Sequence, residues 1–71
     1  MGSIHENHQN AQEFLDRLAE TMSMYNVTFS EDNNGVSVFI NNMFMGFLED
    51  NHDTINIMLD DEPVCSASKD I

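Results

Sequence analysis

Histidine and acidic residues are the side chains of this sequence that could bind a metal ion, because imidazole and carboxylate groups are common zinc ligands. His5 and His8 are three residues apart and could share one turn of a helix, whereas His52 stands in a polar segment with Asp50 and Asp53. The sequence has no His-Glu-x-x-His motif, and its single cysteine excludes a site built on paired cysteines. The histidines therefore do not predict a zinc site.

A calcium-binding loop around Gly35 is the second possibility. Asp32 and Asn34 fall at offsets like those of an EF-hand loop. The first and last ligand positions would then be Ser30 and Asn41, where an EF-hand requires Asp and Glu. We therefore expect no specific metal site and no cofactor, and only weak association of Mg²⁺ or Ca²⁺ with the acidic segments.

The residues that could act in catalysis do not form a recognisable catalytic arrangement in the sequence. Cys65 stands in a segment of small and polar residues, with no neighbouring base to activate it as a nucleophile. The adjacent carboxylates of Asp60 and Asp61 could do acid–base work only in a sheltered pocket, which a turn in so small a domain rarely supplies. The three glycines are not clustered, so no phosphate-binding loop is present. We expect that the protein is not an enzyme.

The charge balance is the most unusual feature of the chain. Thirteen Asp and Glu residues face two Lys and Arg residues, for a formal net charge of −11. Repulsion among these acids costs stability, and the net negative charge opposes binding to nucleic acid or an anionic membrane. The expected partners are basic proteins, polyamines or metal ions, and simple solubility is the alternative explanation.

The sequence also predicts where the protein acts. One cysteine allows no internal disulfide, which fits a reducing cytoplasm. The N-terminus lacks the basic and apolar regions of a secretory signal. No apolar run approaches the roughly 20 residues that span a bilayer. We expect a cytoplasmic protein.

A helix followed by strands must hold these residues in place. Apolar residues at spacings of three and four predict a helix from about residue 8 to 25, ending at Asn26. Asn10 with Glu13, or earlier Ser3 with Glu6, resembles a capping box. The apolar stripe comprises Ala11, Phe14, Leu15, Leu18, Met22 and Tyr25.

After the helix the period changes to two, which predicts strands near 27–33, 36–41, 43–49 and 54–60. Asn34-Gly35 and Asn41-Asn42 predict the first two tight turns. We expect an α+β fold with one N-terminal helix packed on a four-stranded antiparallel meander. The expected domain covers residues 7–62, with a flexible N-terminus (1–6) and a flexible tail (63–71).

These turns set the register of the sheet and therefore its two faces, because residues opposite each other share a face. The predicted pairs are Phe29 with Ile40, Phe39 with Phe44, and Val38 with Met45. The face expected under the helix holds Val27, Phe29, Val36, Val38, Ile40, Met43, Met45, Phe47, Ile55, Ile57 and Leu59. The other face is expected to lie open and to offer Phe39, Phe44, Leu48 and Met58 to a partner or a second copy.

Acidic residues gather at the predicted ends of the strands. The first and third turns of a meander lie at one end of the sheet, and the acids there are Glu31, Asp32, Glu49, Asp50 and Asp53. Arg17 is the only strong base in the expected folded region, so no cation is expected near them. Carboxylates spaced on a rigid frame can imitate nucleic-acid phosphates and fit a groove of Lys and Arg.

In size, acidity, scarcity of Lys and Arg, and helix-plus-hairpins pattern, residues 4–62 resemble the small phage-encoded inhibitors of host defence, namely anti-CRISPR and DNA-mimicking anti-restriction proteins. No motif carries the resemblance, so it assigns no functional residue. It implies an inhibitor that occupies a basic, nucleic-acid-binding surface of a host protein. The alternative is a small oligomeric adaptor or antitoxin-like module, acting through the open sheet face and forming a homodimer.

The net charge generates the first testable prediction. Raising the salt concentration from a low value to about 0.15 M shortens the Debye length to about 8 Å and screens the repulsion among the acids. We expect the melting temperature to rise over this range in a thermal unfolding series. A flat or falling melting temperature would mean that bound cations or local pairing already neutralise the acids.

Overall fold

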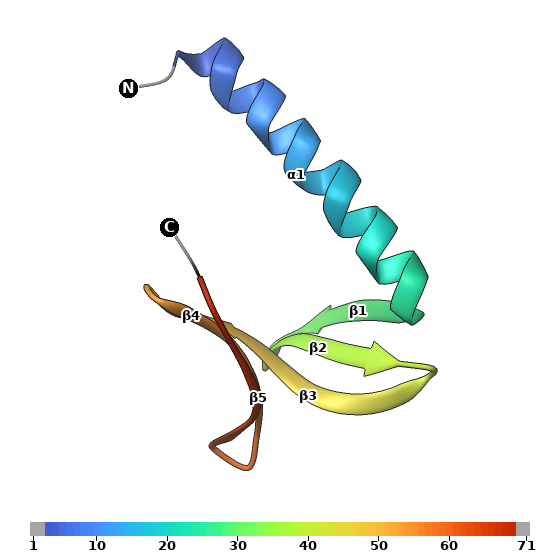
Figure 1. Ribbon diagram of the computed structural model, residues 1–71. Helices are drawn as coiled ribbons and strands as arrows, with labels where there is room; N and C mark the ends of the chain where they lie inside the picture. Colours follow the sequence, from blue (N-terminus) through green and yellow to red (C-terminus); the bar gives the residue numbers. More distant parts are fainter. Residues whose placement is uncertain (1–2, 70–71) are drawn as a thin grey trace.

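The computed structural model describes residues 3–69 and consists of one helix followed by five strands (Figure 1). The elements are α1 (Ile4–Tyr25), β1 (Val27–Asp32), β2 (Gly35–Ile40), β3 (Met43–Asp50), β4 (Thr54–Leu59) and β5 (Glu62–Ser68). Neighbouring strands are antiparallel, and their order in the sheet is their order in the chain. The predicted α+β class is confirmed, with a meander of five strands where four were expected.

Polar caps define both ends of α1. The hydroxyl oxygen of Ser3 accepts a hydrogen bond from the backbone N–H of Glu6 at 3.2 Å, which satisfies a free donor of the first turn. At the other end Asn26 adopts the left-handed conformation, with φ 54°, and its N–H bonds back to the last turn. The predicted end is confirmed, but the helix begins at Ile4 rather than near residue 8. Of the N-terminus expected to be flexible, residues 1–2 lie outside the described residues.

The helix does not cover the sheet, and this overturns the predicted packing. Figure 1 shows α1 rising away from the strands, and none of its residues is buried. Its contacts with the sheet centre on β1, where Leu18 and Met22 are half-buried. Two hydrogen bonds hold this end in place: Asn41 N–H donates to the carbonyl of Asn26 at 3.0 Å, and the side-chain amide of Asn26 donates to the Asn41 side chain at 3.0 Å. The sheet face expected under the helix therefore lies largely uncovered by it.

The first hairpin turns one residue earlier than predicted. Asn33 and Asn34 form the turn, and Gly35, at φ +119°, pairs with Asp32. The backbone N–H of Asn34 donates a hydrogen bond of 2.8 Å to the Asp32 carboxylate, which stabilises the turn. Phe29 consequently pairs with Val38 and Val27 with Ile40, a shift of two residues from the prediction that leaves each side chain on its expected face.

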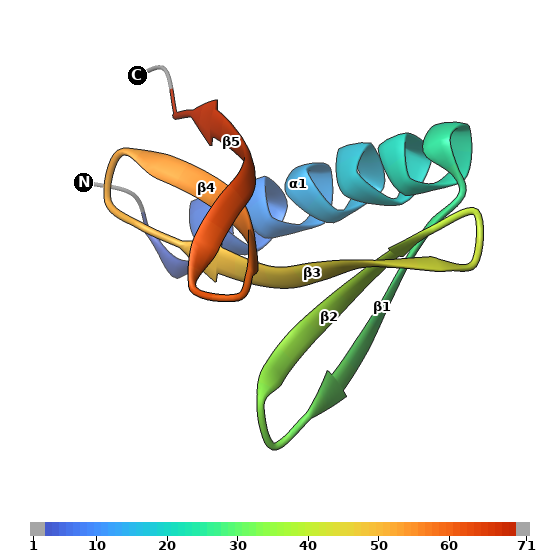
Figure 2. The same cartoon turned by 90° about the horizontal axis from the view of Figure 1, so that it is seen from below.

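A β-bulge in β3 changes the faces from that point onward. Phe39 pairs with Phe44 as predicted, but Val38 pairs with Gly46, so Met45 is an extra residue. Because one inserted residue reverses the alternation, the residues after it move to the opposite faces. Beyond the bulge β3 also changes partner, since Phe47 is the last residue paired with β2 and the first paired with β4. Figure 2 shows the β1–β2 hairpin and the β4–β5 hairpin leaving β3 in different directions, so the sheet is bent.

The segment expected to be a tail forms a strand instead. β5 pairs with β4 from Leu59 opposite Glu62 to Thr54 opposite Ser68, after a turn at Asp60 and Asp61. Both turn residues have positive φ, 55° and 63°, as a two-residue hairpin turn requires. Of the expected tail, residues 70–71 lie outside the described part of the chain.

The sheet encloses very little apolar core. Within residues 3–69, Val38 is the one buried apolar residue, with 3% of its surface exposed. The other residues of the predicted core are half-buried or exposed, and Met43 is 66% exposed. Ser37 and Asn56 are also buried, and their side chains lie on the opposite face of the sheet from Val38. A domain of this size has a small stability margin even when its core is complete.

Gly46 generates a prediction about the bulge. Its φ is +139°, and a Cβ added to it would lie 2.5 Å from the carbonyl oxygen of Met58. Gly35 has a similarly positive φ, but nothing lies within 4 Å of its Cβ position, so it is a matched control. Backbone strain costs about 1–3 kcal/mol at either site, and Gly46→Ala adds a clash with backbone. We expect Gly46→Ala to lower the free energy of unfolding in urea by about 3 kcal/mol or more, clearly beyond Gly35→Ala. Equal losses would show that the close approach to Met58 is unimportant.

Candidate partner-binding surface

Three phenylalanines form a cluster on the face that the helix was not expected to cover. The ring centroids of Phe39 and Phe44 are 5.6 Å apart, and those of Phe44 and Phe47 are 5.4 Å apart in an edge-to-face arrangement. These separations lie in the range where aromatic rings attract each other. Met58 pairs with Phe47 across β3 and β4 and extends the cluster. Phe44 remains 41% exposed, so the cluster also faces solvent.

The bulge exchanges two residues between the faces, and this corrects the predicted assignment of faces. Phe47 was expected in the core but joins Phe44 on the aromatic face. Leu48 was expected beside Phe44 but pairs with Ile57 and so lies on the opposite face, with Val38. The sequence signal was Gly46, since an isolated glycine inside a strand often marks a bulge.

An open hollow of about 370 Å³ adjoins the aromatic cluster. Phe47 and Met58 supply apolar surface to it, and Glu49, Asp60 and Asp61 supply carboxylates. Asn34 and Leu48 complete the lining. The hollow therefore combines an apolar wall with three acidic groups, and it lies between the β1–β2 and β4–β5 turns.

Sequence reasoning did not place Asp60 and Asp61 beside Phe47 and Met58, and so missed this hollow. It treated the segment after them as a tail, so the turn between β4 and β5 was not recognised. Two adjacent aspartates, which tolerate positive φ, followed by the short segment Val64–Ser68 were the available signal.

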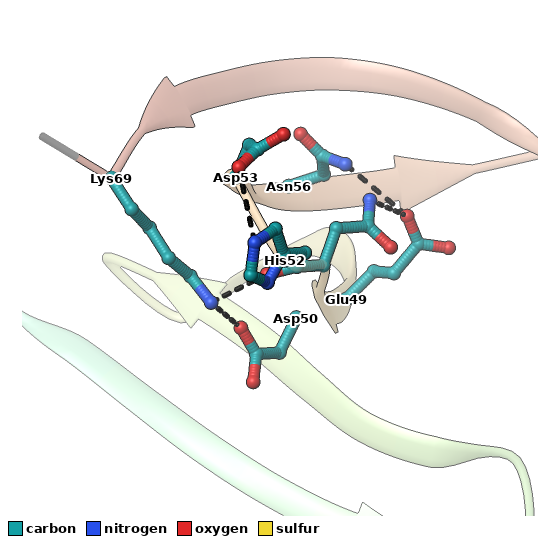
Figure 3. Close-up of polar contacts among 7 residues, drawn as sticks. Glu49, Asp50, His52, Asp53, Asn56 and Lys69 are labelled. Atoms are coloured by element: carbon teal, nitrogen blue, oxygen red, sulfur yellow. Dashed lines mark hydrogen bonds and ion pairs between the residues drawn. The ribbon is translucent and has the colours of Figure 1, made fainter.

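The acidic loop between β3 and β4 holds its own cation, contrary to expectation (Figure 3). The Lys69 ammonium forms an ion pair with the Asp50 carboxylate and donates to the Asn51 carbonyl. Its backbone N–H also donates to the carbonyl of Asp53 at 2.8 Å. β5 brings Lys69 to this loop, so the predicted absence of a nearby base is wrong because the tail is a strand.

Glu49 and His52 complete the interactions of this loop. One Glu49 oxygen accepts hydrogen bonds from the side-chain amides of Asn51 at 2.9 Å and Asn56 at 3.2 Å (Figure 3). His52 lies 3.7 Å from a carboxylate oxygen of Asp53, and both side chains are almost fully exposed. Glu49 is therefore fixed in position, whereas the His52–Asp53 contact lies in solvent.

The five acids predicted to converge do not form one group. Figure 2 shows the β3–β4 loop, which follows Asp50 and carries Asp53, far from the β1–β2 turn. Glu31 and Asp32 are exposed at that turn. The bend at Phe47 causes this separation, because it directs the end of β3 away from β2. Asn34 of the β1–β2 turn lines the same hollow as Asp60 and Asp61, so the β1–β2 turn instead lies near the β4–β5 turn.

Along residues 3–69, no group of three or more His, Cys, Asp or Glu side chains is arranged to hold a metal ion. No helix in the same range combines the length and apolar composition needed to cross a membrane. Comparisons of the chain with known protein families, curated proteins and solved structures find no match.

The aromatic cluster generates a prediction of its own. Phe44 contacts two rings, whereas its neighbour Met43 points to the other face and is 66% exposed. We expect Phe44→Ala to lower the free energy of unfolding by about 1–3 kcal/mol, from lost ring contacts and burial. Met43→Ala should cost less than about 0.5 kcal/mol, as most surface substitutions do. Equal unfolding midpoints in urea for the two variants would mean that the cluster does not stabilise the sheet.

Proposed function

We propose that this protein is an acidic binding domain that occupies a basic surface of another protein. The observation that supports this proposal is the hollow, where Phe47 and Met58 lie beside the carboxylates of Glu49, Asp60 and Asp61. An arginine or lysine side chain has the matching chemistry, since its apolar stem packs on apolar groups while its charged end meets carboxylates. Arginine fits best, because its planar guanidinium stacks on aromatic rings and bonds carboxylates in pairs.

The distribution of cations in the chain supports a basic partner. Arg17 pairs with Glu13 on the helix, and Lys69 pairs with Asp50 in the β3–β4 loop. The sequence contains no other Lys or Arg. The carboxylates of Asp60 and Asp61 therefore have no strong base of their own chain beside them, and a partner would supply it.

We further propose that the basic surface is a nucleic-acid-binding one. Such surfaces carry rows of Lys and Arg that release counterions when an anionic chain binds, and spaced carboxylates can act in place of phosphates. The resemblance to small phage-encoded inhibitors of host defence, in size, acidity and architecture, supports the same conclusion. The proposal includes action in the cytoplasm, which the exposed and unpaired thiol of Cys65 favours.

A second candidate is a protein-binding adaptor that acts through the aromatic face. The exposed part of Phe44 favours it, because exposed aromatic surface is typical of interfaces. The two candidates differ in their dependence on salt. Binding through the acidic hollow should weaken as salt rises, whereas binding through the aromatic face should tolerate salt.

The acidic hollow is tested by replacing Asp60 and Asp61 with Asn. Asn removes the charge and also accepts the positive φ of this turn, so the hairpin should be preserved. The control is Glu13→Gln with Glu20→Gln, which removes the same charge from the exposed helix. With a labelled arginine-rich peptide as probe in fluorescence anisotropy, we expect the hollow variant to weaken binding about tenfold or more.

The control pair should weaken peptide binding by less than about threefold, an effect of net charge alone. Equal losses in the two variants would show that the peptide responds to total charge and not to the hollow. No loss in either variant would contradict the acidic mode of binding altogether.

A further inference from the structure

The folded chain exposes more surface than a stable monomer of its size. Its accessible surface is 6024 Å², whereas a folded monomer of 8.1 kDa exposes about 4,500 Å². Its radius of gyration is 13.9 Å, against about 11 Å for a compact domain of 71 residues. The excess, about 1,500 Å², is more than the roughly 800 Å² per partner of a standard interface. The area matches what an obligate dimer buries.

The helix α1 carries a regular apolar seam that its own sheet covers only in part, at Leu18 and Met22. Residues at alternating spacings of four and three repeat every seven positions, which is the pattern of helices that pair with helices. The apolar members of this seam are Ile4, Ala11, Leu15, Leu18, Met22 and Tyr25. His8 takes the remaining position, and one polar residue in a seam is a known device for fixing register. Ile4, Leu15 and Tyr25 are each more than half exposed.

The charges of α1 lie away from this seam. Its four acids are Glu6, Glu13, Asp16 and Glu20, and all occupy the positions remote from the seam in the seven-residue repeat. The flanking positions hold uncharged groups or His5, with Phe14 the largest apolar one. Two copies of a chain with net charge −11 can therefore bring these seams together without placing carboxylates against each other.

We propose that two copies of this chain form a dimer through the seam of α1, helix against helix. The hydrogen bonds between Asn26 and Asn41 fix the direction in which α1 leaves its own sheet. Leu18 and Met22 are half-buried, and the rest of the seam is open to another chain. A basic partner would favour the acidic side of the helix, whereas the seam and its flanks are apolar or uncharged and match a second seam. The acidic hollow lies at the β4–β5 turn, at the other end of the molecule from α1 (Figure 1). The dimer is thus independent of the proposed function.

The mass in solution tests the dimer. Sedimentation equilibrium of the full chain should give twice 8.1 kDa at micromolar concentration. Leu15→Gln with Leu18→Gln keeps helix propensity and charge and should weaken self-association by about 100-fold or more. Met24→Gln is the control, since Met24 is 69% exposed and off the seam, and it should leave the mass unchanged. A cooperatively folded wild-type monomer, or a double variant that dimerises like the wild type, would overturn the proposal.

A cross-link tests the seam even if the double variant fails to fold. Leu15 lies near the middle of α1, so it faces its counterpart whether the two helices are parallel or antiparallel. In a Cys65→Ser background, Leu15→Cys should form a disulfide between chains under mild oxidation, because the two Cα atoms must come within about 7 Å. Glu13→Cys, on the outer side of the helix, should not. Equal cross-linking at the two positions, or none at Leu15→Cys, would overturn the pairing of the seams.

Discussion

The carbonyl oxygen of Met58 occupies the place where a side chain at position 46 would lie, and only glycine avoids this clash. Because Gly46 also has φ +139°, the backbone of β3 can insert an extra residue and turn from β2 toward β4. Phe47 then faces the other phenylalanines, and Glu49 reaches the hollow beside it. The bend of the sheet, the aromatic cluster and the acidic hollow all depend on this one close approach between strands.

A second constraint lies at the junction of helix and sheet. Asn26 ends α1 in the left-handed conformation and is bonded to Asn41 at the turn between β2 and β3. This junction sets the direction of the helix, which does not cover the sheet. As a result, Val38 is the one buried apolar residue of the described chain. The proposed association with a second copy would account for both the seven-residue apolar repeat and the incomplete core of the same chain.

The local features of the sequence predicted most of the secondary structure, because each has a short-range cause. Asn26 as helix end and Asn41-Asn42 as a turn follow from the tolerance of asparagine for positive φ, and both are confirmed. The pairing of Phe39 with Phe44 follows directly from that turn. The predictions that failed depend on contacts between residues far apart in the sequence. The alternation of β3 does not show that the backbone of Met58, twelve residues away, leaves no room for a side chain at position 46. The one extra residue inserted there exchanged the faces of Phe47 and Leu48.

The packing of the helix could not be predicted for a related reason. An apolar stripe shows that a helix buries one face, but it does not show whether the covering surface belongs to the same chain. The fifth strand was missed because residues 64–68 are mostly small and carry no strong strand signal, so that their strand structure depends on pairing with β4. Without that strand Lys69 had no predicted place, and the acids of the β3–β4 loop were expected to lack a base.

Among residues 3–69 the open meander also has two unpaired edges, one on β1 and one on β5. Free edges invite pairing with other chains, and proteins commonly block them with charged residues or proline. β1 carries Glu31 and Asp32, and β5 carries Pro63 at its start. We therefore expect the high negative charge to oppose edge-to-edge pairing of the sheet, and salt to act on this protein in two opposed ways. Screening should relieve the repulsion within one folded chain, but it should also lower the barrier that keeps the edges of different chains apart.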